Sequence, residues 1–228
     1  YQRILAQFFW PGVKHEVELF VQGCLTCQQI KYSTQSPAGL LQPLPLPELI
    51  WEDLSMDFVI GLPKSQGYTV MLVIVDRLSK YCHIGPLDSH FTATKVAQLF
   101  LQLVVKLHGF PRSIVSDRDS IFMSKFWQEL FRLSGTKLFM SSAYHPQTDG
   151  QTEALNRVVQ QYLRSYAMDR PQDWISYLPW AEFAYNVSFH EGARITPFEA
   201  VYGRTPPTIP MYLRGSSKLE AIDYELKN

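Results

Sequence analysis

Residues 54–87, LSMDFVIGLPKSQGYTVMLVIVDRLSKYCHIGPL, decide the fold of this chain. They contain three apolar runs with the length and the β-branched content of strands, at 54–60, 69–75 and 80–87. Turn-forming residues separate the runs, namely Gly61, Pro63, Gly67 and Asp76. Because antiparallel strands can be joined by short turns, this spacing predicts a three-stranded antiparallel meander.

Two further strands and several helices are predicted after the meander. The strands are expected at 113–117 and 136–142, and a helix over 125–134 connects them. A helix over 93–108 precedes them, and its apolar face carries Val96, Leu99, Phe100, Leu103, Val104 and Leu107. Since crossovers through helices join parallel strands, we predict an α/β fold with a mixed five-stranded sheet, in which the first strand pairs with both the second and the fourth.

The remaining part of the chain is predicted to be mainly helical. A polar loop at 143–150 leads to an amphipathic helix, and Thr148 and Gln151 form a capping box at its start. The buried stripe of this helix is expected to be Leu155, Val158, Val159, Tyr162, Leu163 and Tyr166. Another helix is expected after Pro179, and a short one has Thr196 as its N-cap. We expect the late aromatic residues to be core or subunit-interface residues rather than base-stacking groups: Trp174, Tyr177, Trp180 and Phe183.

Four segments are expected along the chain. Residues 1–32 form a helical segment that ends in a Cys-x-x-Cys turn, and residues 33–50 form a proline-rich connector. Residues 51–210 form the main α/β domain, and 211–228 form a C-terminal linker in which the periodicity fades. Because the N-terminus lacks Met and resembles no signal peptide, we expect the chain to be the middle of a longer polypeptide.

Composition limits the classes of function. Of the 228 residues, 46% are hydrophobic and 18% are charged, as in a soluble protein with a hydrophobic core. No apolar run approaches about 18 residues, so we expect no membrane partner. The 21 basic and 21 acidic residues balance, and nucleic-acid binding therefore needs a local basic face. Three cysteines make no disulfide framework, which favours a reducing compartment.

Three carboxylates are placed as a metal site requires. Asp57 lies inside the first apolar run, Asp117 ends the fourth predicted strand, and Glu153 begins the amphipathic helix after a gap of 35 residues. A carboxylate among apolar residues costs several kcal/mol unless it is paired or bound to a metal. Oxygen ligands suit Mg²⁺ or Mn²⁺. The three acids therefore predict a divalent-metal site for phosphoryl transfer on polynucleotides.

Each of these acids also has a simpler interpretation. A lone Asp in a strand, such as Asp57, is usually at an edge or a turn, and Asp117 can cap a strand end. An acid in the first helical turn, such as Glu153, is favoured by the helix dipole. Together, in one β-β-β-α-β-α-β-α frame, the three fit a shared site better than the remaining acids do. Those remaining candidates are Asp53, Asp76, Asp119 and Asp149.

Several long motifs resemble the integrase of gypsy-type LTR retrotransposons. They are WEDLSMDFVIGLPKS, VDRLSKYCHI, HGFPRSIVSDRDSIF, YHPQTDGQTEALNR, LPWAEFAYN and TPFEAVYGRTPP. The stretch FFWPGVKHEVELFVQGCLTCQQIK is similar to the second half of the zinc-binding segment of that family. The resemblance covers nearly residues 1–210. It implies an RNase H-like core preceded by a truncated zinc-binding segment, with Asp57, Asp117 and Glu153 as the catalytic triad.

The resemblance also implies a mechanism and partners. Two Mg²⁺ or Mn²⁺ ions per active site are expected, with Asp57 bridging both, Asp117 completing one site and Glu153 the other. Water would cleave near each 3′ end of the element's DNA, and the freed 3′-hydroxyl would attack target DNA. The expected partners are double-stranded DNA, as element ends and target, and further copies of the chain. The expected location is the nucleus.

The zinc-binding segment is incomplete on this reading. In the resembling family an upstream His pair completes a His₂Cys₂ site, whereas here Cys24 and Cys27 supply only half of it. His15 aligns with a helix-surface position rather than a ligand. The two cysteines can equally be small buried residues. We therefore expect Zn²⁺ only in a longer parent chain, and we expect Cys82 to be a core residue.

DNA contacts are expected from the polar loop and from the exposed side of the helix that follows it. The candidates are Tyr144, His145, Gln147, Gln151, Asn156, Arg157, Gln160 and Arg164. The alternative for each is an ordinary solvated surface residue. Two alternative functions also remain at this point. One is an RNase H-like transposase or ribonuclease, and the other is a host-adopted or catalytically silent DNA-binding or interaction module.

Overall fold

The computed structural model describes residues 4, 8–24, 47–140, 150–167 and 170–206, except the side chains of 150–154 and of Tyr166. Five strands form one sheet, namely β1 (Asp53–Val59), β2 (Tyr68–Asp76), β3 (Cys82–Asp88), β4 (Ser113–Ser116) and β5 (Lys137–Met140). The helices are α2 (Val13–Gly23), α4 (Ala93–Phe100), α5 (Lys106–His108), α6 (Lys125–Ser134), α7 (Gly150–Tyr166), α8 (Trp174–Asn186) and α9 (Pro197–Tyr202). No helix in this described part of the chain is long and apolar enough to cross a bilayer.

The sheet has the order β3-β2-β1-β4-β5. Short turns join β1, β2 and β3, which pair antiparallel, while helical crossovers lead to β4 and β5, which are parallel to β1. The predicted mixed five-stranded sheet, with the first strand between the second and the fourth, is confirmed. In the pairing of β1 with β4, Leu54 lies opposite Ile114 and Met56 lies opposite Ser116.

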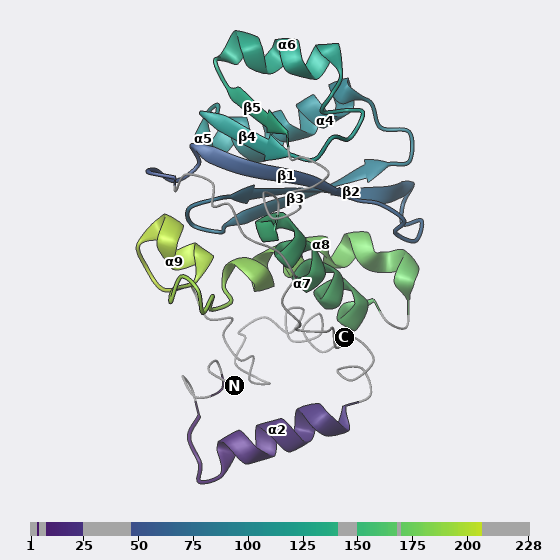
Figure 1. The fold of residues 1–228 in the computed structure, drawn as a ribbon. Coiled ribbons are helices and arrows are strands. Elements are labelled where there is room, and N and C mark those ends of the chain that lie inside the picture. The colour runs from purple at the N-terminus through teal and green to yellow at the C-terminus, as the bar shows by residue number, and fades with distance from the viewer. Residues whose placement is uncertain (1–3, 5–7, 25–46, 141–149, 168–169, 207–228) are drawn as a thin grey trace, which may run out of the picture.

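Helices cover both faces of the sheet (Figure 1). Leu54 and Met56 of β1 point into a core that α4 and α6 complete with Phe100 and Trp127. The opposite face packs against α7 and α8 through a second core, whose buried residues include Val59, Met71, Val73, Leu155, Val159 and Leu163. Each such side chain contributes about 1.5–3 kcal/mol on burial. Strand β2 is therefore apolar on both of its faces, as its unbroken apolar sequence predicts.

A π-helical segment, Leu101–Val105, interrupts the helix predicted over 93–108. A π turn contains an extra residue, so it rotates the following residues around the helix axis. Leu107, which simple periodicity places on the buried face, is 58% exposed for this reason, and that prediction is wrong. His108 instead stacks on Trp51, with ring centroids 3.8 Å apart and planes at 5° to each other.

The helix expected after Pro179 begins earlier, at Trp174, with Pro179 inside it. Proline removes one helical hydrogen bond, but burial of Trp174 and Leu178 holds the preceding turns against α7 and the sheet. The Trp174 indole also donates to the Pro63 carbonyl at 2.7 Å. The short helix α9 begins after the predicted N-cap Thr196, which forms a capping box with Glu199. The Thr148 capping box of α7 lies outside the described residues.

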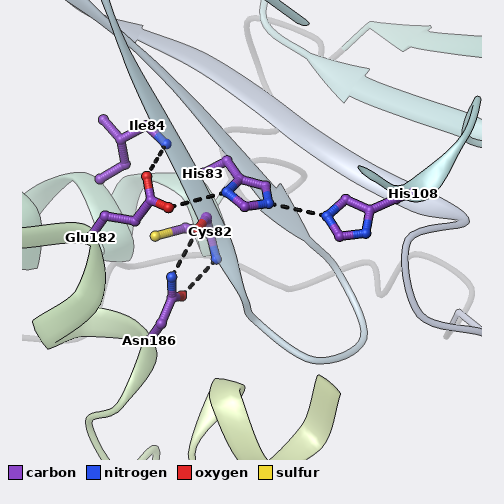
Figure 2. A network of polar contacts seen from close by, with 6 residues as sticks. All are labelled: Cys82, His83, Ile84, His108, Glu182 and Asn186. Atoms are coloured by element: carbon purple, nitrogen blue, oxygen red, sulfur yellow. Dashed lines mark hydrogen bonds and ion pairs between the residues drawn. The ribbon is translucent and has the colours of Figure 1, made fainter. Parts of the chain in front are cut away.

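Side chains from α8 cover the backbone of β3, an edge strand of the sheet (Figure 2). The Asn186 carboxamide accepts from the Cys82 N–H at 2.8 Å and donates to the Cys82 carbonyl at 2.9 Å. Glu182 accepts from the Ile84 N–H at 2.8 Å and contacts the His83 ring at 3.1 Å. His83 in turn contacts His108 at 3.1 Å. Cys82 is fully buried, as predicted.

Candidate active site

Asp57 lies on β1, on the sheet face that α7 covers. Its neighbours Met56 and Phe58 point into the opposite core, because successive strand residues alternate between faces. The Asp57 carboxylate accepts from the side-chain amide of Asn156 in α7 at 2.6 Å. It also accepts from the backbone N–H of Phe58 at 2.8 Å. The side chain is half-buried, so a charge is held partly out of water at the junction of sheet and helix.

Asp117 is the first residue after β4, at the same end of the sheet as Asp57. Met56 of β1 pairs with Ser116 of β4, and the two strands are parallel. Asp57 and Asp117 each follow one member of this pair, so they lie side by side. Burial raises the pKa of Asp117, the Asp119 charge raises it further, and a hydrogen bond from the Asp119 N–H opposes both effects. That bond is 3.0 Å long. Asp117 is therefore an acid whose charged form is costly in this protein.

Helix α7 brings the third part of the site. Glu153 lies on α7 three positions before Asn156, and its side chain is outside the described part of the chain. Asn156 is only 8% exposed, so its expected position on the exposed side of the helix is wrong. It faces the sheet because its amide binds Asp57. Its carbonyl oxygen is buried and, among the described residues, has no hydrogen-bond partner. Whether Asn156 contacts DNA stays a prediction.

The other predicted DNA contacts divide into two groups. Arg157 and Arg164 are exposed on α7 and Gln160 is half-buried. Gln160 and Arg164 border a cavity of about 440 Å³, which also touches the Val59–Pro63 segment after β1. These side chains thus extend from the acid end of the sheet along α7. The remaining candidates lie outside the described residues or have undescribed side chains: Tyr144, His145, Gln147 and Gln151.

Two of the competing acids, Asp53 and Asp76, have structural partners, and Asp149 lies outside the described residues. Asp53 accepts hydrogen bonds from the Arg112 guanidinium and the Ser113 hydroxyl. Burial alone would raise the pKa of Asp53, but these bonds and the positive charge of Arg112 lower it overall. Asp76 accepts from the Trp51 N–H and from Ser79. The arrangement therefore separates the acids of the site from acids that hold the turns at the other end of β1.

Metal ligands are described only in part. Among side chains that the structure describes, no three His, Cys, Asp or Glu residues converge as a metal site, and Glu153 is not among those side chains. In the N-terminal segment Cys24 is half-buried and His15 is exposed on α2, while Cys27 lies outside the described residues. The half zinc site of Cys24 and Cys27 stays a prediction.

Sequence reasoning placed Asp57 and Asp117 correctly at one end of the sheet but missed the contact between Asn156 and Asp57. The signal was available in part, because residues three apart lie on one face of a helix. Asn156 follows Glu153 by three residues. If Glu153 faces the sheet, Asn156 must therefore face the sheet as well. The sequence analysis assigned Glu153 to metal and Asn156 to DNA, and it did not use this spacing to bring Asn156 to Asp57.

Comparison with known proteins identifies two regions of the chain. Residues 52–146 match the family model of the integrase core domain, and residues 1–33 match that of the integrase zinc binding domain. The Tf2-3 and Tf2-4 transposon polyproteins of Schizosaccharomyces pombe are each 38% identical over 210 residues. That alignment covers 92% of this chain and 16% of each polyprotein.

Solved structures show the same fold. A simian T-cell lymphotropic virus intasome in complex with the PP2A regulatory subunit B56 gamma matches with a TM-score of 0.61 and 18% identity, over 90% of this chain and 72% of that chain. The HTLV-2 integrase catalytic core domain, solved with magnesium in a dimeric form, matches with a TM-score of 0.53 and 21% identity, over 66% of this chain and 95% of that one. With the two domain matches and the transposon relatives, the chain belongs to the integrase family that transposon polyproteins contain.

Proposed function

We propose that this chain carries the catalytic core of a retroelement integrase that processes the 3′ ends of element DNA and joins them to target DNA. The integrase core domain family is one of polynucleotidyl transferases, which supports the reaction class. The observation that carries the proposal is the pair Asp57 and Asp117, which follow a matched register pair on parallel strands. The facing helix α7 contacts Asp57 through Asn156.

Divalent cations fit the residues of this site. The donors are carboxylates, which Mg²⁺ and Mn²⁺ prefer. Burial and a neighbouring acid raise the pKa of Asp117, and a cation would relieve that cost. Asp57, Asp117 and Glu153 would hold the ions, since helical spacing puts Glu153 on the face of α7 that carries Asn156. Bound ions would supply an activated attacking oxygen and would stabilise the leaving oxygen.

The protein's own groups would orient the site and hold DNA. The Asn156 amide fixes the Asp57 carboxylate, as outer partners fix metal ligands in general. Exposed Arg157 and Arg164 would contact phosphates, and Gln160 would contact the DNA from the cavity rim. These two arginines would supply the local basic surface that DNA binding requires in a chain of zero net charge. Double-stranded DNA, assembly from several copies and action in the nucleus belong to this proposal.

A strand-transfer assay tests the proposal. An integrase protein that contains residues 1–228 would be incubated with labelled element-end DNA, target DNA and Mg²⁺ or Mn²⁺. Joined product that disappears in the Asp57→Asn variant is the expected result. Cleavage without joining would favour an RNase H-like transposase or ribonuclease. DNA binding with neither reaction would favour a non-enzymatic module.

A further inference from the structure

A second cavity, of about 510 Å³, lies on the other flank of α7. Val158 and Tyr162 line it, and at about 100° per residue they lie roughly opposite Gln160 on the helix. Its volume is in the range of about 300–1,000 Å³ that small-molecule sites occupy. The cavity is therefore separate from the acid end of the sheet and from the proposed DNA-binding flank.

The walls of this cavity are largely apolar. Val75 of β2, Leu155 of α7 and Phe189 after α8 contribute aliphatic and aromatic surface. Tyr162 and Ser188 form one polar point, where their hydroxyl groups lie 3.3 Å apart. The Ser188 hydroxyl donates onward to the Ala184 carbonyl at 2.5 Å. A ligand of this cavity must therefore have a mainly apolar body.

Among the described residues that line the cavity, Lys80 is the one cation. The turn between β2 and β3 places it there, and its ammonium donates to the Arg77 carbonyl at 2.6 Å. No carboxylate of the described residues lies within 4.0 Å of this ammonium. The nearby Asp76 carboxylate already accepts from the Trp51 and Ser79 N–H groups and from the Ser79 hydroxyl. Lys80 therefore has donor capacity to offer an anion.

The charge around Lys80 favours a monoanion. His190 also lines the cavity, and burial together with the Lys80 charge lowers the pKa of its ring, which disfavours its charged form. Glu191 lines the cavity too and is exposed. Among the described residues of the lining, Lys80 is the one cation and Glu191 the one acid, so the second negative charge of a dianion such as a phosphate monoester would have no partner.

We propose that this cavity binds a small amphipathic carboxylate, with the carboxylate on Lys80 and the apolar body between β2, α7 and the segment after α8. Such a site is distinct from the integrase reaction and independent of it. Apolar burial supplies most of the affinity, and the charge-assisted hydrogen bond from Lys80 sets the orientation.

An NMR titration of the full 228-residue chain with 4-phenylbutanoate tests the proposal. The matched ligand is 4-phenylbutanamide, which has the same apolar body without the charge. Resonances of residues around Val158 and His190 should shift with the acid, and the amide should bind at least about tenfold more weakly. Equal binding of acid and amide, no binding at millimolar acid, or shifts confined to another surface would overturn the proposal.

Variants test the role of Lys80 itself. Lys80→Met should weaken binding of the acid at least about tenfold and leave binding of the amide unchanged. Lys106→Met, which removes an exposed lysine on α5, should leave both unchanged. Val158→Trp keeps Lys80 but fills the cavity, and it should abolish binding of both ligands. Unchanged acid binding by folded Lys80→Met, or by Val158→Trp if the first variant does not fold, would refute the site.

Discussion

The acids near the two ends of β1 have pKa values that are shifted in opposite directions. At the first end Asp53 is held by the Arg112 guanidinium and the Ser113 hydroxyl, and its pKa is lowered. At the other end Asp117 accepts a backbone N–H, lies within 4.0 Å of no described Lys or Arg nitrogen, and has a raised pKa. An acid whose partners belong to the fold stabilises the fold. An acid whose charged form the fold does not stabilise is available to bind a ligand.

The largest expected effect is on catalysis by Asp57. Asp57→Asn should reduce metal-dependent DNA joining at least about a thousandfold, beyond the 10²–10³ that one lost hydrogen-bond donor typically costs. The melting temperature should stay the same or rise slightly, because the change removes a half-buried charge beside other acids. Strand-transfer assays and thermal melts measure the two effects. A variant that melts several degrees lower yet still joins DNA would show that Asp57 is a structural acid like Asp53.

The second largest effect on DNA joining is expected from substitution of Asn156. Asn156→Ala removes the amide that holds Asp57, and joining should fall about 10–100-fold, as for outer partners of metal ligands. A positioning role predicts that higher Mn²⁺ concentration restores part of the activity, since the acids themselves remain. The measurement is the joining rate as a function of Mn²⁺ concentration. If the loss is independent of metal concentration and follows a lowered melting temperature, Asn156 belongs with the structural residues.

Asp53→Asn should act on stability rather than on chemistry. Breaking its pairing with Arg112 and Ser113 should cost about 1–3 kcal/mol, which lowers the melting temperature by several degrees in a chain of this size. DNA joining at a temperature where the variant is folded should be unchanged. Calorimetry with a joining assay measures both. If the variant loses DNA joining but keeps its stability, Asp53 acts in the reaction and is not a structural acid.

The smallest effect concerns pH. The lowered pKa of Asp53 means that its stabilising contribution is present above the ordinary value of 3.8 and is lost as the pH falls through the folded pKa. The raised pKa of Asp117 has the opposite sign: its ionisation costs stability as the pH rises from 3.8 through the folded pKa. In metal-free buffer at neutral pH, Asp117→Asn should therefore melt about 1–3 °C higher. Melts of both variants from acid to neutral pH should converge on the wild type in acid.

The strands and their pairing followed from local sequence. Apolar runs of strand length, short turns between the first three and helices before the last two leave few alternatives for the sheet. Asp57 and Asp117 could be placed at one end of it because each position within its strand was known from sequence. The N-cap Thr196 of α9 was equally local.

The errors arose where tertiary packing decides. The side on which Asn156 lies depends on how α7 is rotated against the sheet, which its own sequence fixes only approximately. Leu107 was misplaced because a π turn changes the helical period without a sequence signal such as proline. The start of α8 was misplaced because burial of Trp174 and Leu178 outweighs the cost of Pro179 within the helix.

The covering of β3 by α8 has a consequence for how copies of the chain can meet. An uncovered edge strand offers its N–H and C=O groups to any other strand, including the same strand of another copy. Here Asn186 and Glu182 occupy backbone groups of Cys82 and Ile84, and Pro86 has no N–H to offer. Chain-to-chain growth of the sheet is blocked on this side. Any copies of the chain that meet at this edge must therefore touch through side chains rather than through strand pairing.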